Sequence, residues 1–148
     1  DNALSRGKFR VLGKKVSLSD VTIPIMVQAG RDDHISPFKS VYRTARLYGG
    51  PTELVLAGSG HIAGVINHPD AKKYQHWTNP DLPKSTEEWL EGAEEHPGSW
   101  WTHWLDWLKP KSGAKIDALV PEDKGLGDAP GAYVRRRLED LGVGPSAG

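Results

Sequence analysis

Two short runs of apolar residues stand out in the first half of the chain. Residues 25–29 form a nearly continuous apolar run that follows Pro24 and stops at Gly30. Such a run is typical of a strand covered on both faces, with proline at its beginning because proline cannot donate to the hydrogen-bond ladder. Residues 54–57 form a second run, which ends at the Gly-Ser-Gly turn of residues 58–60. The two runs predict two strands.

Apolar residues at helical spacing lie between these two predicted strands. Ser36 can cap the helix, Pro37 can occupy its first turn, and Gly49 and Gly50 stop it. Its apolar face comprises Phe38, Val41, Tyr42, Ala45 and Tyr48. Strand, helix and strand in immediate succession make a βαβ unit with a right-handed crossover. The sequence therefore predicts an α/β fold with parallel strands.

The remaining patterns predict a hairpin and two further helices. Residues 8–18 contain two β-prone stretches separated by a glycine, which indicates two short strands or a loose hairpin. Residues 85–88 form a capping-box pattern, which predicts a helix that ends near Pro97. Ser99 can cap the next helix, whose apolar stripe runs through residues 100–108.

The chain contains six tryptophans, and four of them fall between residues 100 and 107. Tryptophans can form a platform for a sugar or an aromatic ligand, or they can pack in a core. Because the group has helical spacing, core packing is the favoured interpretation and the ligand platform is the alternative.

The last part of the chain differs in composition. Residues 110–148 contain seven glycines and four prolines, a content typical of irregular structure. We therefore expect a folded part over residues 1–109 and an extended tail over residues 110–148. The basic run from Arg135 to Arg137 could suggest a phosphate or membrane patch, but two acidic residues follow it closely, which favours a solvated surface.

Composition excludes several classes of protein. Equal numbers of basic and acidic residues, 19 each, remove the positive excess that nucleic-acid binders carry. The absence of cysteine excludes disulfides, zinc–thiolate sites and a cysteine nucleophile within these 148 residues. No apolar run approaches the roughly 18 residues of a membrane span. The first residue is Asp1, with neither an initiator methionine nor a signal-peptide pattern, and two parallel strands leave open sheet edges, so we expect part of a longer polypeptide.

Candidate chemistry lies where the two predicted strands end. Asp33 follows the first strand and His61 follows the second, 28 residues later. The carboxyl ends of parallel strands meet at one sheet edge, so the two side chains can meet. An aspartate bound to one imidazole nitrogen fixes the tautomer and leaves the other nitrogen to accept a proton from a nucleophile. Taken singly, each residue is more often structural than catalytic, since an Asp after a strand often caps a turn.

Two other interpretations of this region are weaker. Asp32, Asp33, His34 and His61 include possible metal ligands, but adjacent residues of one loop rarely all point at one ion, so we expect no metal site. Ser59 is not part of a G-x-S-x-G nucleophile elbow. Its glycine neighbours favour a turn that lets two backbones approach closely.

Four segments stand out in order along the chain: Gly30 to Pro37, Leu54 to Asn67, His96 to Trp101 and Ala129 to Val134. The most specific stretches within them are Gly-His-Ile-Ala-Gly-Val-Ile-Asn and Gly-Ser-Trp-Trp. Together the four segments resemble the C-terminal part of polyhydroxyalkanoate synthases, and the similarity extends from about Asn2 to Tyr133. His68 departs from the family, which usually has proline there.

The resemblance implies an α/β-hydrolase fold, of which this chain supplies the last βαβ unit, the C-terminal helices and the tail. It also implies that Asp33 and His61 match the Asp and His of a Cys-His-Asp triad. The nucleophilic cysteine of the family is absent from these residues, which implies that the chain alone is inactive. His34 is expected to shape the loop.

The implied activity is an acyl transfer in which 3-hydroxyacyl-CoA thioesters extend a polyester and release CoA. The implied partners are the substrate, the growing polyester, the granule surface, the N-terminal remainder of the enzyme and a second copy in a homodimer. No separate cofactor is expected, because the substrate carries CoA, and the location is cytoplasmic, on polyester granules. The Gly-Ser-Trp-Trp segment is more similar to single-subunit synthases. The alternative is an inactive structural or interaction module without the nucleophile.

Overall fold

The computed structural model describes residues 2–119, 124–125, 127–137 and 139–142, and the chain divides into two compact units. The first unit spans Asp1–Ser112 and contains every strand in the described residues. The second unit spans Gly113–Gly148 and has short 3₁₀ turns at Tyr133–Arg135 and Glu139–Leu141. Within it the side chains of Arg135 to Arg137 are exposed, as expected for a solvated run.

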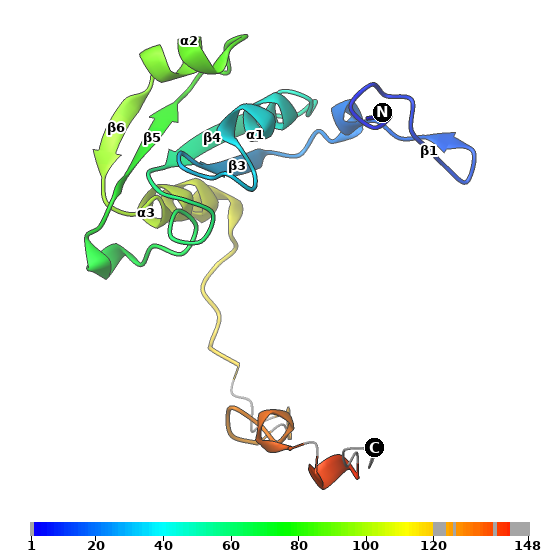
Figure 1. Ribbon diagram of the computed structural model, residues 1–148, viewed down its shortest axis with the longest axis vertical. Helices are drawn as coiled ribbons and strands as arrows, with labels where there is room; N and C mark the ends of the chain where they lie inside the picture. The colour runs from blue at the N-terminus through cyan, green and yellow to red at the C-terminus, as the bar shows by residue number, and fades with distance from the viewer. Residues whose placement is uncertain (1, 120–123, 126, 138, 143–148) are drawn as a thin grey trace, which may run out of the picture. The chain divides into compact units, whose positions relative to one another are not determined.

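The first unit is built around a mixed sheet of four strands in the order β3-β4-β5-β6 (Figure 1). Strands β3 (Ile25–Gly30) and β4 (Thr52–Ala57) are parallel, and helix α1 (Phe38–Ala45) connects them. This confirms the predicted strand-helix-strand unit. Strands β5 (Gln75–Asn79) and β6 (Glu94–Pro97) extend the sheet in antiparallel fashion beyond β4. The chain thus has a mixed α/β fold.

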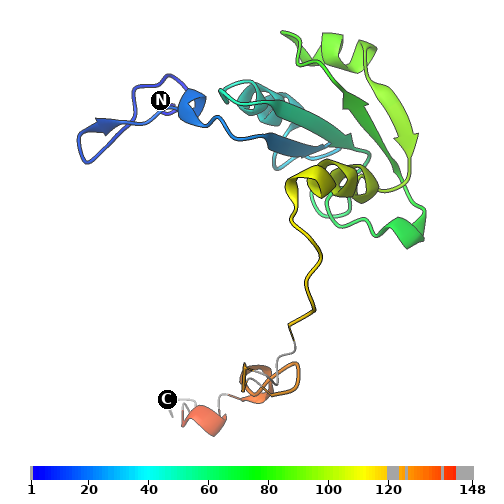
Figure 2. The same cartoon turned by 180° about the vertical axis from the view of Figure 1, so that it is seen from behind.

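The two faces of the sheet have different neighbours. On one face, Leu54 and Leu56 of β4 pack with Tyr42 of α1 and with Trp89 of helix α2 (Thr86–Glu91), forming the hydrophobic core. On the other face, Glu53 contacts His103 of helix α3 (Trp101–Leu108) (Figure 2). Since successive strand residues point to opposite faces, β4 is buried from both sides. Leu54 to Ala57 are almost inaccessible, whereas β3 is fully buried only at Ala29 and Gly30.

The predicted helix from the capping box to Pro97 is wrong in its second half. Ser85 accepts the Glu88 N–H at 3.1 Å, so the cap forms, but α2 ends at Glu91 and the chain enters β6. Gly92 lies at the turn, and it favours termination because glycine loses more conformational freedom in a helix than any other residue. The polar residues of β6 pair with β5 at an outer position of the sheet, where side chains can remain exposed.

The bounds of helices α1 and α3 also differ from the prediction. Helix α1 begins after Pro37 with no side-chain cap and ends at Ala45, before the predicted stop at Gly49. Helix α3 begins one residue later than predicted, although the hydroxyl of Ser99 accepts the N–H of Trp101 at 3.1 Å. The first 3₁₀ turn beyond α3 spans Lys109–Lys111 and includes Pro110.

The N-terminal hairpin and the tryptophans complete the comparison. Strands β1 (Arg10–Val11) and β2 (Lys14–Lys15) pair in antiparallel fashion, which confirms the predicted hairpin. Core packing is confirmed for Trp77 and Trp89, which are buried. It is wrong for Trp104, which is exposed.

Candidate functional site

The site lies at the edge of the sheet where the two parallel strands end. β3 and β4 are paired in register as far as Gly30 and Ala57, so both following loops leave the sheet at the same level. The backbones stay in contact beyond the strands, because Arg31 N–H donates to the carbonyl of Ala57 at 2.8 Å. Asp32 N–H donates to the carbonyl of Ser59 at 3.1 Å. The two loops are therefore linked before either reaches its candidate side chain.

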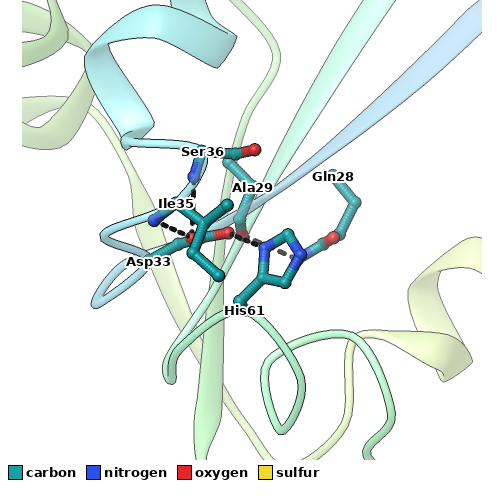
Figure 3. Close-up of polar contacts among 6 residues, drawn as sticks. All are labelled: Gln28, Ala29, Asp33, Ile35, Ser36 and His61. Atoms are coloured by element: carbon teal, nitrogen blue, oxygen red, sulfur yellow. Dashed lines mark hydrogen bonds and ion pairs between the residues drawn. The ribbon is translucent and has the colours of Figure 1, made fainter.

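The structure brings Asp33 and His61 into direct contact (Figure 3). The Nδ1 atom of His61 lies 2.8 Å from Oδ2 of Asp33, which confirms the expected contact between these side chains. The Asp33 side chain is 6% exposed, whereas that of His61 is 45% exposed. The carboxylate is thus enclosed, and the imidazole is accessible from solvent.

Asp33 is held by more than His61. Its Oδ1 atom accepts the backbone N–H groups of Ile35 and Ser36, each at 2.8 Å (Figure 3). These contacts lower the pKa of Asp33, with the Ser36 hydrogen bond as the largest cause, followed on the same side by His61; burial opposes them. Hydrogen bonds to the charged form stabilise it. Asp33 is therefore an ionised carboxylate that accepts on both oxygens.

The two backbone donors were not predicted from sequence. Ser36 was expected to cap α1 through its hydroxyl, but its N–H serves Asp33 instead. An Asp that accepts from the second and third residues after it forms an Asx-type turn. The signal available in the sequence was an Asp shortly before Ser-Pro in a loop that follows a strand.

The contact with Asp33 determines which nitrogen of His61 can do chemistry. An ionised carboxylate can only accept a hydrogen bond, so Nδ1 carries the ring proton and donates a hydrogen bond to Oδ2 of Asp33. The other ring nitrogen, Nε2, is then an acceptor. A pair of this kind can act as a general base whose orientation and tautomer are set by the aspartate.

The glycines beside the site let the two backbones approach closely. A Cβ atom on Gly30 would lie 2.9 Å from the carbonyl oxygen of Ser59. A Cβ atom on Gly64 would lie 2.7 Å from the carbonyl oxygen of Gly60. Real Cβ atoms do not approach backbone this closely, so these positions require glycine. A Cβ atom on Gly58 would lie 2.9 Å from the carbonyl oxygen of Gln75, whereas one on Gly60 would lie 3.6 Å from its nearest neighbour, so the close-approach interpretation of residues 58–60 is confirmed for Gly58.

The other residues considered near the site do not join the pair. His34 and Asp32 are exposed, and Asp32 contributes through its backbone rather than its carboxylate. Among the described residues, no group of three or more His, Asp or Glu side chains is placed to hold a metal ion. The structure therefore gives no support to a metal site built from Asp32, Asp33, His34 and His61.

A second carboxylate and imidazole pair lies at the other end of the parallel strands. Glu53 bonds His103 at the wall of a cavity of about 520 Å³. The cavity is also lined by Trp107 and Lys111, and the Lys111 ammonium lies 4.0 Å from the centre of the Trp107 ring. Sequence reasoning missed this pair, because the contact joins residues 50 positions apart on β4 and α3.

A buried carboxylate that orients an accessible imidazole, at the carboxyl edge of an α/β sheet, is an arrangement that can serve as a general base. Comparison with known proteins identifies a particular relative. The chain is 48% identical over 139 residues to the poly(3-hydroxyalkanoate) polymerase subunit PhaC of Rhizobium etli, which covers 92% of the chain and 22% of that protein. The motif-based resemblance to the C-terminal part of polyhydroxyalkanoate synthases is therefore confirmed.

Other relatives show the same partial coverage. PhaC of Cupriavidus necator is 42% identical to the chain over 135 aligned residues. The alignment covers 88% of the chain and 23% of that protein. The poly(3-hydroxyalkanoate) polymerase of Methylorubrum extorquens is 38% identical to the chain over 141 aligned residues. The alignment covers 93% of the chain and 23% of that protein. The chain thus spans less than a quarter of the length of these relatives. A comparison with models of protein families found no match.

The helices in the described part of the chain are all too short or too polar to cross a membrane.

Proposed function

We propose that this chain supplies the aspartate and the histidine of a Cys-His-Asp triad in a poly(3-hydroxyalkanoate) polymerase with an α/β-hydrolase fold. The observation that carries the proposal is the 2.8 Å contact between His61 Nδ1 and Asp33 Oδ2, which leaves Nε2 free to accept a proton. Similarity to polymerases over about nine tenths of the chain supports the same activity. The nucleophilic thiol comes from a segment outside these 148 residues, which contain no cysteine.

In the proposed reaction, His61 takes the proton of the thiol. The thiolate attacks the carbonyl carbon of a 3-hydroxyacyl-CoA and forms an acyl-cysteine as the bond to the CoA sulfur breaks. The CoA sulfur leaves with the proton that His61 took from the thiol, so His61 is again neutral. His61 then accepts the proton of a 3-hydroxyl group, whose oxygen attacks an acyl-cysteine to form the new ester and release the cysteine sulfur. Asp33 stabilises the imidazolium in both steps.

The proposal includes the rest of the enzyme. The substrates are 3-hydroxyacyl-CoA and the growing polyester, with no separate cofactor, because CoA arrives on the substrate. The complete synthase is a single-subunit type that forms a homodimer and acts in the cytoplasm at the surface of polyester granules. The competing proposal is an inactive interaction or structural module that keeps the Asp33–His61 contact without a nucleophile.

The test uses the natural full-length polypeptide that contains these residues. Release of CoA from 3-hydroxybutyryl-CoA is followed with a thiol reagent, and circular dichroism monitors folding. His61→Ala should lower turnover by roughly a thousandfold or more, since it removes the proton acceptor. His68→Asn is the matched control, because asparagine keeps an acceptor for the Asp70 N–H that His68 binds.

The outcome decides between the two functions. Loss of turnover in His61→Ala with normal turnover in His68→Asn supports the triad. Turnover close to that of the unmodified protein in a folded His61→Ala variant contradicts it. A natural polypeptide that releases no CoA, although it is folded, would favour the inactive module.

A further inference from the structure

Two side chains anchor the ends of the segment that carries His61. The His61 imidazole bonds Asp33, and the buried Asn67 donates from Nδ2 to the Lys73 carbonyl at 3.0 Å. Between them, residues 61–67 form a short irregular turn, with Gly64 N–H donating to the Gly60 carbonyl at 2.9 Å and Ile66 N–H donating to the Ile62 carbonyl at 2.8 Å. Ile62 and Ile66 are exposed, so burial of apolar side chains does little to fix the middle of the turn, and contacts of its backbone contribute to its position.

One backbone carbonyl of this turn accepts two hydrogen bonds. The carbonyl oxygen of Val65 accepts two indole N–H groups, from Trp101 at 2.9 Å and from Trp100 at 3.2 Å. A carbonyl oxygen has two lone pairs, so the two tryptophans together use its full capacity as an acceptor. Val65 follows His61 by only four residues.

The two tryptophans are themselves fixed to the sheet. They lie at the start of α3, directly after Ser99, which is buried and whose hydroxyl accepts the Trp101 N–H at 3.1 Å. The preceding residue, Gly98, donates its N–H to the Tyr74 carbonyl at 2.9 Å and accepts from His76 Nδ1 at 3.2 Å. A chain of hydrogen bonds thus runs from β5 through the start of α3 to the turn that carries His61.

We infer that Trp100 and Trp101 are positioning residues for His61. This inference rests on the proposed function. The Asp33 contact holds the imidazole at Nδ1, whereas the two indoles hold the backbone on the far side of the turn. A general base loses efficiency when its geometry is disturbed by a fraction of an ångström, so both restraints contribute to turnover. This role differs from core packing and from binding an aromatic ligand.

The test is the double variant Trp100→Phe with Trp101→Phe in the natural full-length polypeptide. Phenylalanine keeps an aromatic ring but removes both N–H donors. We expect kcat to fall about tenfold with KM unchanged, and each single variant to lower it about threefold, since one donor remains. The matched control is Trp107→Phe on the same helix, whose ring faces the cavity at the other end of the strands.

A readout that a merely structural role would not change accompanies the kinetics. The proton between His61 Nδ1 and Asp33 Oδ2 gives a downfield proton NMR signal, which should weaken in the double variant and persist in Trp107→Phe. Unchanged kcat in the double variant, or a loss that only follows the folded fraction with an unchanged NMR signal, overturns the inference. His61→Ala separates the two claims: if it abolishes turnover while the double variant behaves like the unmodified protein, only the positioning role is wrong.

Discussion

Both oxygens of the Asp33 carboxylate are used, and for different purposes. Oδ1 accepts from the backbone of Ile35 and Ser36, which fixes the loop, and Oδ2 faces His61. The backbone contacts hold the pKa of Asp33 below its ordinary value, so it remains ionised. The contribution of the carboxylate to stability is therefore present above the pKa of the unfolded chain and is lost as pH falls through the lower folded value.

Asp33→Asn should separate the two purposes. The amide oxygen can still accept from Ile35 and Ser36, so the loop should fold, but the NH₂ group now faces His61 and can only donate. Nδ1 must then accept, which moves the ring proton to Nε2 and removes the base. We expect kcat of the full-length enzyme to fall roughly 10³–10⁴-fold with an unchanged circular dichroism spectrum. Asp32→Asn is the control, and an active Asp33→Asn enzyme would contradict the assigned tautomer.

The pair was predictable from sequence and its supports were not. Asp33 and His61 each follow an apolar run that ends in a loop, and the topology of parallel strands brings such loops together. The N–H groups of Ile35 and Ser36 are backbone atoms, which no residue type reveals. The indole contacts of Trp100 and Trp101 with Val65 join segments 35 and 36 residues apart, and their position depends on β5 and β6.

At the scale of elements, two histidines of the antiparallel strands and one histidine of α3 lie close together. The rings of His76 and His96 are stacked with centres 5.2 Å apart, and the ring of His103 lies 6.1 Å from that of His76. Burial is the main cause that lowers the pKa of His76, and the two neighbouring histidines act in the same direction, whereas the bond to Gly98 opposes them. His76 is thus kept neutral in the folded chain.

This predicts a loss of stability in acid. Below about pH 6.5, the ordinary value for histidine, the unfolded chain binds a proton that folded His76 does not, so the free energy of unfolding falls as pH falls. One such proton changes the free energy of unfolding by at most about 1.4 kcal/mol per pH unit. In His76→Gln the decline between pH 7 and pH 5 should be smaller, as measured by chemical denaturation at each pH. His68→Gln, at an exposed position, should leave the slope unchanged; equal slopes in all three proteins would refute the argument.

The elements were predictable where hydrophobic periodicity was strong. The strand-helix-strand unit has apolar runs and an amphipathic helix, and its strands and helix are present. β5 and β6 contain mostly polar residues, and their pairing is set by the register with β4 rather than by a local pattern. The capping box at Ser85 correctly marks a helix start, but it carries no information about where the helix ends.

At the scale of the whole molecule, the described site is an acid–base pair in a chain that has no cysteine. Expressed by itself, the 148-residue chain should release no CoA from 3-hydroxybutyryl-CoA above background, because the pair has no thiol to activate. The thiol-release assay measures this, with the full-length enzyme as the positive control. Turnover by the isolated chain that is sensitive to His61→Ala would show that another group serves as the nucleophile.

The hydrogen bonds that link the loops after β3 and β4 also restrict how such a chain can change in length. Asp33 is the third residue after the end of β3, and His61 is the fourth after the end of β4. Because the first residues of both loops are bonded to each other, one inserted residue before either side chain could not be absorbed by a bulge and would rotate that side chain away from its partner. We expect insertions to be tolerated better near Lys72, which is exposed. Among related chains, we therefore expect length to vary after the turn that carries His61, and to stay constant between β3 and Asp33 and between β4 and His61.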